Sequence, residues 1–586
     1  MLLQALDDLY HRLAGEPEYE IAPPGYSLQK ITFCVVLNPD GTLHEFQDAR
    51  QEVDGRLRPQ QLLVMGSAKS PGSGLNPGFL WDNTGYMLGF REDDGKPERT
   101  RQTFDSFRQR HTEAAPHIAS ESFAAVCRFL DGWNPAKAEE SAVLREAGST
   151  GFGVFRIVGE LGYVHEDPAV RAWWGQHVMD SGSGEEGECL VSGRRAPLAR
   201  THDKIKGVDG AQSAGGAIVG FNAPAYESYA KSQSFNAPVS ESVAFRYVTS
   251  LNALLDGPQR AKHRRVIGDT TVVFWTDRPS PVEDIFLEFA SGGSTGVMTE
   301  PAQDEGQRQR MADFLHALKE GRPVYGGVVP DPDGTRFWLL ALSANQARIV
   351  VRFFWKGTVS GLLDNLRRHH ADIGLTPAPP SGKWRGDPEF PGLKSLLAQS
   401  AREAKDIPPV LEAPLLASII SGSRYPAALA AAVLRRIRAD REVDYLRCCV
   451  IKGYLNRNLN LEVPMSLDSE RPDPAYRLGR LFAALEKTQR DALGEKLSTT
   501  IRDAFYSSAS ATPGTVFPRL LRTYQHHLAK LEGGRRVNRE RLVQEIMEPL
   551  DSLPTHLPLA GQGLFALGYY HQIRDFYTKR DDSTDN

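Results

Sequence analysis

Apolar residues recur at helical spacing over residues 2–13, where five leucines would share one face of a helix. A Pro-Pro-Gly sequence at 23–25 ends this pattern. Residues 31–37 are β-branched and aromatic, and the turn-forming residues 38–41 separate them from a second short strand near 43–46. The chain is therefore predicted to open with an amphipathic helix and a β-hairpin.

Mixed patterns continue through the first two thirds of the chain. Residues 66–78 are rich in Gly, Ser and Pro and are predicted to form an extended loop. Helical stripes at 100–111 and 121–130 alternate with β-branched runs at 154–158, 266–276 and 336–354. We expect mixed α and β structure here, with antiparallel strands.

The pattern changes after the Pro/Gly-rich segment 376–390, the best candidate for a linker. Beyond it, apolar residues recur at helical spacing and few β-branched alternations interrupt them, which predicts an all-α helical bundle. The fold class is therefore predicted as α+β, with domains 1–375 and 391–586. The predicted helices span 408–421, 425–439, 445–456, 475–492, 496–507, 516–531, 538–550 and 562–577.

A run of small and polar residues between Lys204 and Leu255 matches neither an amphipathic helix nor a strand. Side-chain amides and glycine backbone N–H groups suit close contact with a polar, stacked ligand. Isolated aromatic residues in the run would stack on bases or, as the alternative, pack in a core. They are Phe221, Tyr226, Tyr229 and Phe235.

Composition places limits on this interpretation. The 586 residues are enough for two or three domains, and the formal net charge of -4 argues against coating nucleic acid by bulk charge. The 5 cysteines show no zinc-site spacing, which suggests a reducing cytosol. With neither a signal peptide nor a long apolar run, the protein is expected to be cytoplasmic and without a membrane partner.

Catalytic motifs are absent from the sequence. It contains no GxxxxGK[ST], GxSxG or HExxH pattern. The dipeptide His202-Asp203, with Asp209 nearby, is the basis of an alternative interpretation as a metal-dependent nuclease, but a solvated loop is the simpler one. We therefore expect no enzymatic activity, no cofactor and no metal.

Basic residues gather in five patches despite the acidic total. Such patches bind phosphates by releasing counterions, although each is also compatible with a solvated helix face. The last patch has seven basic residues against two glutamates, a net charge of +5. The patches lie at 96–110, 194–206, 260–265, 435–441 and 519–541.

Six elements resemble one family in their order along the chain, the large subunit of the type I-C CRISPR effector complex (Cascade). The run 204–255 contains Gly-x-Gln-Ser, Phe-Asn, Ser-Tyr and Asn-Ala-Pro, and 78–89 contains Leu-x-Asp-Asn-x-x-Tyr-x-x-Gly. Two residues depart from the family pattern, Gly220 in place of serine and Ala230 in place of glycine. The other elements lie at 1–43, 270–277, 337–355 and 476–489.

The resemblance implies a subunit of an RNA-guided complex that recognises the protospacer-adjacent motif, starts R-loop formation, holds the non-target strand and helps to recruit the helicase-nuclease. Its implied partners are the CRISPR RNA-containing complex, with backbone and 5′-handle-binding subunits, and target double-stranded DNA. The residues expected to bind DNA are Lys69, Asn76, Asn83, Lys204, Lys206, Gln212, Asn222, Asn236, Arg519, Arg522, Arg535, Arg536 and Arg539.

One further expectation concerns Met465, which follows Pro464 just before the last helical segments. Members of the resembled family make their small subunit from an internal start, so residues 465–586 are a candidate separately translated subunit. A scaffold without direct DNA contact remains the third alternative, beside the DNA-binding subunit and the nuclease.

Overall fold

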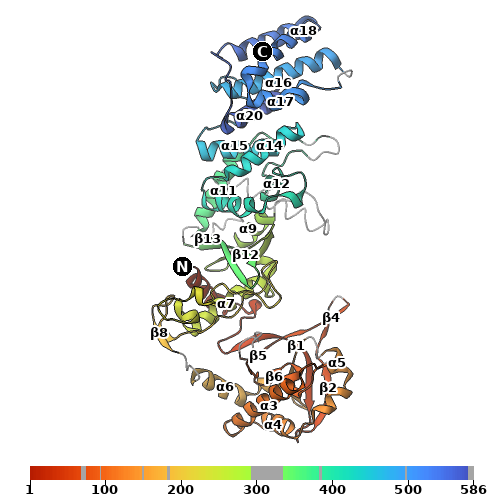
Figure 1. Ribbon diagram of the computed structural model, residues 1–586, viewed down its shortest axis with the longest axis vertical. Helices are drawn as coiled ribbons and strands as arrows, with labels where there is room; N and C mark the ends of the chain where they lie inside the picture. Colours follow the sequence, from red (N-terminus) through yellow and green to blue (C-terminus); the bar gives the residue numbers. More distant parts are fainter. Residues whose placement is uncertain are drawn as a thin grey trace, which may run out of the picture. The chain divides into compact units, whose positions relative to one another are not determined.

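The computed structural model describes residues 1–53, 55–66, 74–92, 94–147, 151–180, 185–280, 282–291, 334–379, 381, 386–494 and 498–577. The chain forms two compact units, and Figure 1 labels the helices and strands that build them. Unit 1 comprises 1–207, 211–259 and 346–349, and unit 2 comprises 208–210, 260–345 and 350–586. The division of the chain at 376–390 stays a prediction.

The predicted opening helix is confirmed as α1 (Leu2–Leu13), which buries Leu6, Leu9 and Leu13. It packs against α7 (Glu241–Asp256), where the guanidinium of Arg246 binds the carboxylate of Asp7 at 2.6 Å. The interpretation of 204–255 as a run without an amphipathic helix was wrong for its last part. Helix α7 buries an apolar stripe at helical spacing, made by Val243, Tyr247, Leu251 and Leu254.

The main sheet of unit 1 is built on β1 (Tyr26–Leu37), whose two halves pair with different strands. Antiparallel β5 (Gln60–Met65) pairs with its first half and antiparallel β2 (Leu43–Asp48) with its second. The short hairpin of β3 (Gln51–Val53) and β4 (Arg56–Arg58) lies between β2 and β5 in the sequence. The other neighbour of β1 is the parallel strand β7 (Phe152–Ile157), which also pairs with β6 (Trp81–Asp82).

A parallel pair requires a crossover, and helices supply it here. Phe107 and Phe123, from two of these helices, join Phe33 and Phe155 of the sheet in one apolar core. This core fixes the position of the helices that hold the candidate site. The helices of unit 1 between α1 and α7 are α2 (Thr84–Leu88), α3 (Pro97–Ala114), α4 (Glu121–Gly132), α5 (Ala142–Glu146) and α6 (Pro168–Asp180).

Two predicted single strands are hairpins in the structure. Residues 266–276 contain β10 (Arg264–Ile267) and β11 (Thr270–Thr276), and residues 336–354 contain β12 (Arg336–Asn345) and β13 (Arg348–Thr358). The turns pass through Gly268 and Gln346, both with positive φ. The four strands form one antiparallel sheet in the order β10-β11-β12-β13.

The helical texture of the remaining chain is confirmed, and with the antiparallel strands it confirms the α+β class. A helix that the sequence analysis missed, α11 (Val359–Ile373), follows the sheet. The other helices are α8 (Arg260–His263), α9 (Val282–Ser291), α12 (Leu393–Ala398), α13 (Glu412–Ser421), α14 (Ala427–Asp440), α15 (Tyr445–Leu459), α16 (Pro474–Leu493), α17 (Ile501–Ala511), α18 (Pro513–Leu528), α19 (Gly533–Met547) and α20 (Leu559–Tyr577).

Helices α16 and α20 approach each other closely through two glycines. A Cβ atom on Gly479 would lie 2.0 Å from the carbonyl oxygen of Phe565, and one on Gly568 would lie 2.0 Å from that of Tyr476. Real side chains do not tolerate such distances, so this helix pair depends on glycine at both positions. In addition, α20 packs against α15, where Gly563 faces Ile451.

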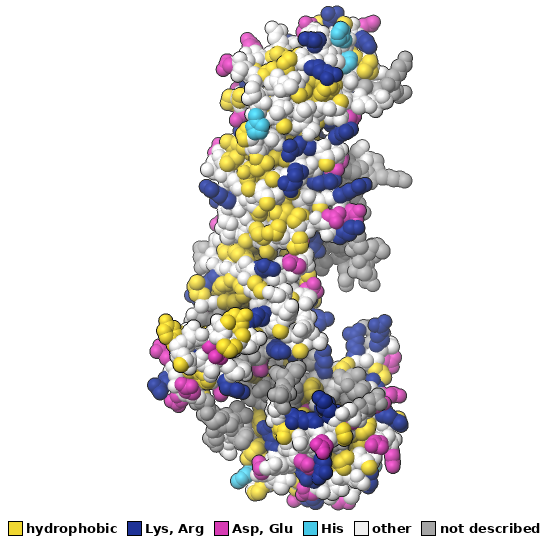
Figure 2. All heavy atoms as spheres, in the orientation of Figure 1, with side chains coloured by type: hydrophobic (Ala, Val, Ile, Leu, Met, Phe, Trp, Pro, Cys, Tyr) yellow, Lys and Arg dark blue, Asp and Glu magenta, His cyan; other side chains and the backbone are white. Residues whose placement is uncertain are grey.

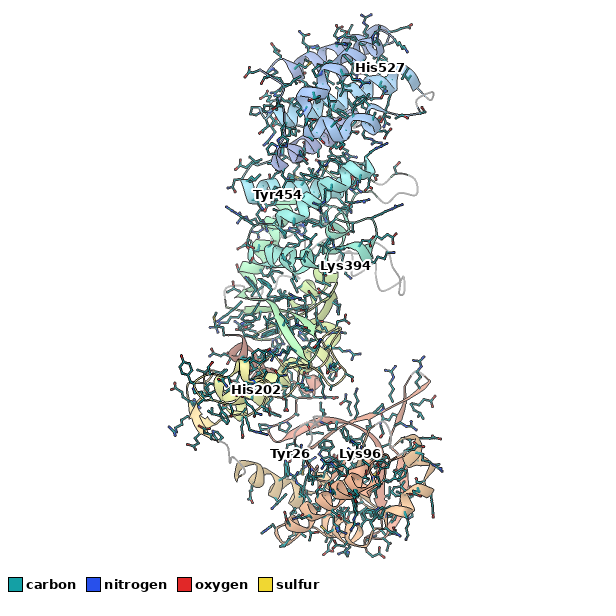
Figure 3. The ribbon with its side chains drawn as sticks, in the orientation of Figure 1. Tyr26, Lys96, His202, Lys394, Tyr454 and His527 are labelled. Atoms are coloured by element: carbon teal, nitrogen blue, oxygen red, sulfur yellow. The ribbon has the colours of Figure 1, made fainter. Side chains whose placement is uncertain are left out.

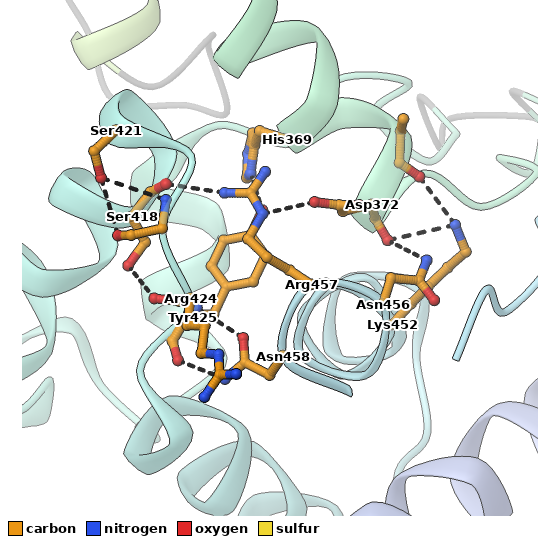
Figure 4. Close-up of polar contacts among 12 residues, drawn as sticks. His369, Asp372, Ser418, Ser421, Arg424, Tyr425, Lys452, Asn456, Arg457 and Asn458 are labelled. Carbon is orange, nitrogen blue, oxygen red and sulfur yellow. Dashed lines mark hydrogen bonds and ion pairs between the residues drawn. The ribbon is translucent and has the colours of Figure 1, made fainter. Parts of the chain in front are cut away.

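A buried polar network joins α11, α13 and α15 (Figure 4). The Arg457 guanidinium binds the Asp372 carboxylate at 2.6 Å and donates to the Ser418 carbonyl at 2.9 Å. It also lies 4.3 Å from the ring centroid of Tyr425. The Lys452 ammonium donates to carbonyls at the end of α11, and burial lowers its pKa to about 8. Each buried charge therefore has polar partners, as the apolar surroundings require.

None of the helices in the described ranges is both long and apolar enough to cross a membrane.

Candidate nucleic-acid interface

The Asp-Asn-x-x-Tyr signature holds the backbone that precedes it. The Asp82 carboxylate is fully buried and accepts the N–H of Gly78 at 2.7 Å. The Tyr86 hydroxyl accepts the N–H of Asn76 at 3.0 Å, and the Trp81 indole donates to the carbonyl of Met65. The signature therefore fixes the chain on both sides of residues 67–73.

Helix α3 provides a second set of contacts to the same segment. Arg99 donates to the Gly74 carbonyl at 2.8 Å, and Arg110 donates to that of Pro77. His111 accepts the N–H of Leu80, a residue with the unusual φ of +63°, at 2.9 Å. Burial lowers the pKa of His111 to about 3, so its ring is neutral at pH 7.

Three residues predicted to bind DNA fall in this region, with different outcomes. Lys69 lies outside the described residues. Asn76 is exposed within the anchored segment, so its side chain is accessible to a ligand. Asn83 is half-buried and caps α2, because its side-chain oxygen accepts the N–H groups of Gly85 and Tyr86 at 3.0 and 3.3 Å. Its direct contact with DNA stays a prediction.

The glycine-rich stretch of the 204–255 run is a loop closed at its neck. Ile205 and Gly216 exchange two backbone hydrogen bonds, of 2.8 and 2.9 Å. Gly207 and Gly215 have positive φ, and a Cβ on either would lie within 2.7 Å of a backbone carbonyl oxygen. Gln212 is exposed on this loop, as the predicted contact with a base pair requires.

The basic residues at the start of the run are fixed through their backbone. The Asn252 side chain accepts the N–H of Lys206 at 2.8 Å and donates to the carbonyl of Lys204 at 3.1 Å. Both lysine side chains are half-buried. Helix α7 therefore sets where this basic segment leaves the core of unit 1.

His202, the main residue of the nuclease alternative, is labelled in Figure 3. Its Nδ1 atom lies 2.7 Å from the hydroxyl of Tyr247, and burial lowers its pKa to about 4. Burial also raises the pKa of Asp203. Among the described residues there is no group of three or more His, Cys, Asp or Glu side chains that could hold a metal ion.

The polar loop after the glycines is tied to Arg348, which belongs to the same unit. The Arg348 guanidinium donates to the side-chain oxygen of Asn222 and lies 4.4 Å from the ring centroid of Tyr226. Asn236 engages three backbone groups of its own loop through its side-chain amide. Asn222 and Asn236 therefore organise this surface, and their direct contact with DNA stays a prediction.

Most of the predicted arginines of the C-terminal patch are exposed, on α18 and α19. Figure 2 shows Lys and Arg side chains on the visible face of these last helices. Arg539 differs, since it is half-buried, binds Asp491 at 3.2 Å and lies 4.6 Å from the ring centroid of Phe576. The exposed ones are Arg519, Arg522, Arg535 and Arg536.

Some site residues were missed by the sequence analysis. Arg348 is separated by 126 residues from Asn222, so no local pattern links the two. Arg99 and Arg110 were noted only as members of a basic patch, whereas they hold the segment of Asn76. Tyr86 belongs to the signature at 78–89, and its fixed spacing from Asp82 was the sequence feature that could have pointed to it.

Comparison with known proteins identifies a family for this chain. The chain matches the family model described as CRISPR-associated protein (Cas_Csd1) over residues 6–577. No curated protein matches the chain. Because the family match spans nearly all of the chain, it agrees with the resemblance carried by the six sequence elements. The chain belongs to the Csd1 family of CRISPR-associated proteins and is thus a subunit of a Cascade complex in antiviral defence.

Proposed function

We propose that this subunit reads the protospacer-adjacent motif in duplex DNA, starts R-loop formation and holds the non-target strand. It acts as a binding subunit of a cytoplasmic complex with the CRISPR RNA, the backbone subunits and the 5′-handle-binding subunit, and it helps to recruit the helicase-nuclease that cuts the target. Base pairing with the guide supplies sequence specificity in such complexes, while protein side chains read a short flanking motif.

One observation carries the motif-reading part of the proposal. Gln212 is exposed on a loop whose neck is closed by the Ile205–Gly216 pair. Glycines of this loop lie close to other backbone atoms of the chain, which holds the loop in place. A side-chain amide can form two hydrogen bonds with a base edge, and a fixed neck lowers the entropy lost on binding. Asn76, on the segment fixed by Tyr86, supports the same role.

The test compares duplexes that differ only beside the protospacer, bound by the assembled complex. Gln212→Ala should reduce the preference for the correct flanking sequence by about 1–3 kcal/mol for each lost base contact. Gln176→Ala removes another exposed glutamine of unit 1 and is the matched control. An unchanged preference in Gln212→Ala would contradict the role of this residue, and a wild-type complex without any preference would contradict the proposal.

The exposed arginines of α18 and α19 support contact with the displaced strand. Neutralising Arg522, Arg535 and Arg536 should weaken binding to all sequences alike and flatten its dependence on salt, because fewer counterions are released. Arg402→Gln removes an exposed arginine elsewhere in unit 2 and should change neither quantity. A scaffold without DNA contact would show no effect of the triple change and no crosslinks to target DNA.

Arg539 provides a second comparison within the same patch. Because its guanidinium is bound to Asp491 and stacked near Phe576, Arg539→Gln should lower the stability of the helical region. Arg535→Gln should leave stability within about 0.5 kcal/mol, as for other surface substitutions. Thermal unfolding separates these effects from the salt dependence of binding.

Contacts around Met465 support its proposed use as an internal start. The backbone just after it is held by α16, because Tyr476 accepts the N–H of Asp468 and Arg480 donates to the carbonyl of Ser469 at 2.6 Å. Met465 itself is 44% exposed. A product that begins there keeps these contacts but loses α15, which covers part of α20.

A C-terminal tag on the gene tests this part of the proposal. We expect two tagged products, at full length and at the length of 465–586, and loss of the shorter one in Met465→Leu. Met547→Leu should leave both products in place, since a start there would omit four of the last five helices. A single full-length band from the unaltered gene would contradict the internal start.

A further inference from the structure

The ring of Tyr229 is exposed to solvent on a turn whose backbone conformation is unfavourable for a residue with a Cβ atom. The residue is 96% exposed. The turn is closed by a hydrogen bond of 3.0 Å from the N–H of Lys231 to the carbonyl of Ser228. Both central residues, Tyr229 and Ala230, have positive φ, of +54° and +56°. Glycine or asparagine is usual at such positions because a Cβ atom is disfavoured there.

The side chain of Asn236 holds this turn in place. Its Oδ1 atom accepts the N–H of Ser228 at 2.8 Å, and its Nδ2 atom donates to the carbonyls of Lys231 and Gln233 at 2.7 and 2.9 Å. The Glu227 carboxylate accepts the N–H of Gln233 at 2.9 Å. Unfavourable backbone conformations persist where the surroundings fix them, and they cluster at functional sites. The backbone that carries the ring of Tyr229 is therefore held in one conformation.

Positive charge accompanies the aromatic rings of this loop. Arg348 lies over Tyr226, which is itself 49% exposed. Lys231 is exposed beside Tyr229, and exposed Arg200 is joined to the loop by the bond from the Ser234 N–H to its carbonyl. Flat aromatic faces next to cations are what single-stranded nucleic acids bind, through base stacking and phosphate contacts.

We propose that Tyr229 stacks on an unstacked nucleobase of a single strand, with Lys231 contacting its phosphate. This inference rests on the proposed function, which supplies an opened strand beside the flanking motif. The base belongs either to the guide RNA or to target DNA, and the chemistry is shared. A protein partner is a poorer fit, because the exposed neighbours Ser228, Ala230 and Lys231 offer little apolar surface around the ring.

Photocrosslinking identifies the occupant. Tyr229 is replaced by p-benzoylphenylalanine, and the assembled complex is irradiated with labelled guide RNA alone, with a labelled target strand, or with a labelled non-target strand. A crosslink to RNA before DNA is added assigns the base to the guide, and a crosslink that appears with the duplex assigns it to DNA. Crosslinks to a protein subunit alone, or none to nucleic acid, overturn the proposal.

Substitutions then measure the stacking. Tyr229→Ala should weaken retention of the identified strand by about 5- to 100-fold, and Tyr229→Phe should stay within about twofold because it keeps the ring. Leu161→Ala, at a fully exposed leucine of unit 1, is the control and should have no effect. Retention of both guide and target at wild-type affinity in Tyr229→Ala overturns the proposal.

The two proposals fail in different ways. Stacking does not depend on sequence, so Tyr229→Ala should weaken retention of the strand identified by the crosslink and leave unchanged which flanking sequence the complex prefers. If the wild-type complex shows no preference for a flanking sequence, the proposed function fails, while the crosslink and the Tyr229→Ala comparison still decide the role of Tyr229.

Discussion

The hydroxyl of Tyr86 accepts the backbone N–H of Asn76 at 3.0 Å. This bond joins α2, which packs against α3, to a segment that Arg99 and Arg110 of α3 also contact. A residue expected to read DNA is thus fixed through its backbone, while its own side chain stays exposed. Such an arrangement lowers the entropy that the segment loses when it binds.

Tyr86→Phe removes this acceptor and keeps the ring. We expect the free energy of unfolding to fall by about 1 kcal/mol, because a typical hydrogen bond contributes that much. The preference for the correct flanking sequence should fall as well, measured with paired duplexes. Tyr577→Phe, at a phenol on a 63% exposed residue, is the control. Lost stability with an unchanged preference would separate Tyr86 from motif reading.

Acid should destabilise unit 1 through His111. The pKa of this residue is about 3 in the folded protein and about 6.5 in an unfolded chain, so the unfolded state binds the proton first. The contribution of the neutral, buried ring to the free energy of unfolding is complete above pH 6.5 and is lost as the pH falls toward 3. Between pH 7 and pH 5 the loss is about 2 kcal/mol. Histidine NMR signals should show a ring that does not titrate above pH 4.5, and titration near pH 6.5 would refute this assignment.

The strained turn predicts an unusual effect of glycine. Ala230→Gly should raise stability by about 0.5 kcal/mol, because relief of the left-handed conformation exceeds the added entropy of the unfolded chain. Ala223, in the same loop, has extended backbone with φ of -146°. Ala223→Gly should therefore lower stability by about 0.5–1 kcal/mol. Chemical denaturation measures both, and equal losses would show that the turn at Ala230 is unstrained.

Because α16 and α20 pack so closely, a side chain at Gly568 should strongly lower the stability of the protein. In Gly568→Ala the new Cβ meets the carbonyl of Tyr476, so the helices must separate, and we expect a loss of more than about 3 kcal/mol. Gly534→Ala places its Cβ in open space on α19 and should raise stability by about 0.5–1 kcal/mol. Thermal unfolding of the two variants provides the comparison. Similar melting temperatures would contradict the close packing.

Two aspartates of α11 form ion pairs that differ in burial, so their substitutions compare a buried pair with an exposed one. Asp372→Ala leaves the buried Arg457 guanidinium without its carboxylate, which should cost about 3–5 kcal/mol. Asp364→Ala breaks a pair with Arg367 in which both side chains are exposed, at a cost of about 0–1 kcal/mol. Urea denaturation of both variants tests this difference, and a small effect of Asp372→Ala would place the network in contact with water.

Helical periodicity was the most reliable guide to the fold. The expected helix at 445–456 is α15, and the one at 562–577 is α20 to within a turn. Hairpins were missed where the turn lacked a strong signal, as at Gln346, because a glutamine with positive φ is not a recognisable turn residue. The apolar stripe of α7 is present in the sequence, but it was missed because the polar run that precedes it was extended through it.

The candidate site was only partly accessible from the sequence. Signature residues such as Asp82 and Asn83 could be located, but their motif does not say whether a polar side chain faces a ligand or the protein's own backbone. Here both accept backbone N–H groups. Long-range partners such as Arg348 and Asn222 depend on the tertiary fold, which local pattern does not encode.

The contact of α20 with both α15 and α16 also bears on synthesis. Helices α17, α18 and α19 also pack against α16, but a nascent chain leaves the face of α16 that meets α20 uncovered until α20 has emerged from the ribosome, so this bundle closes late. A stop codon ahead of α20 would release a product with that face exposed, a substrate for chaperones and proteases. Truncated alleles should consequently disappear from the cell instead of accumulating as partial subunits.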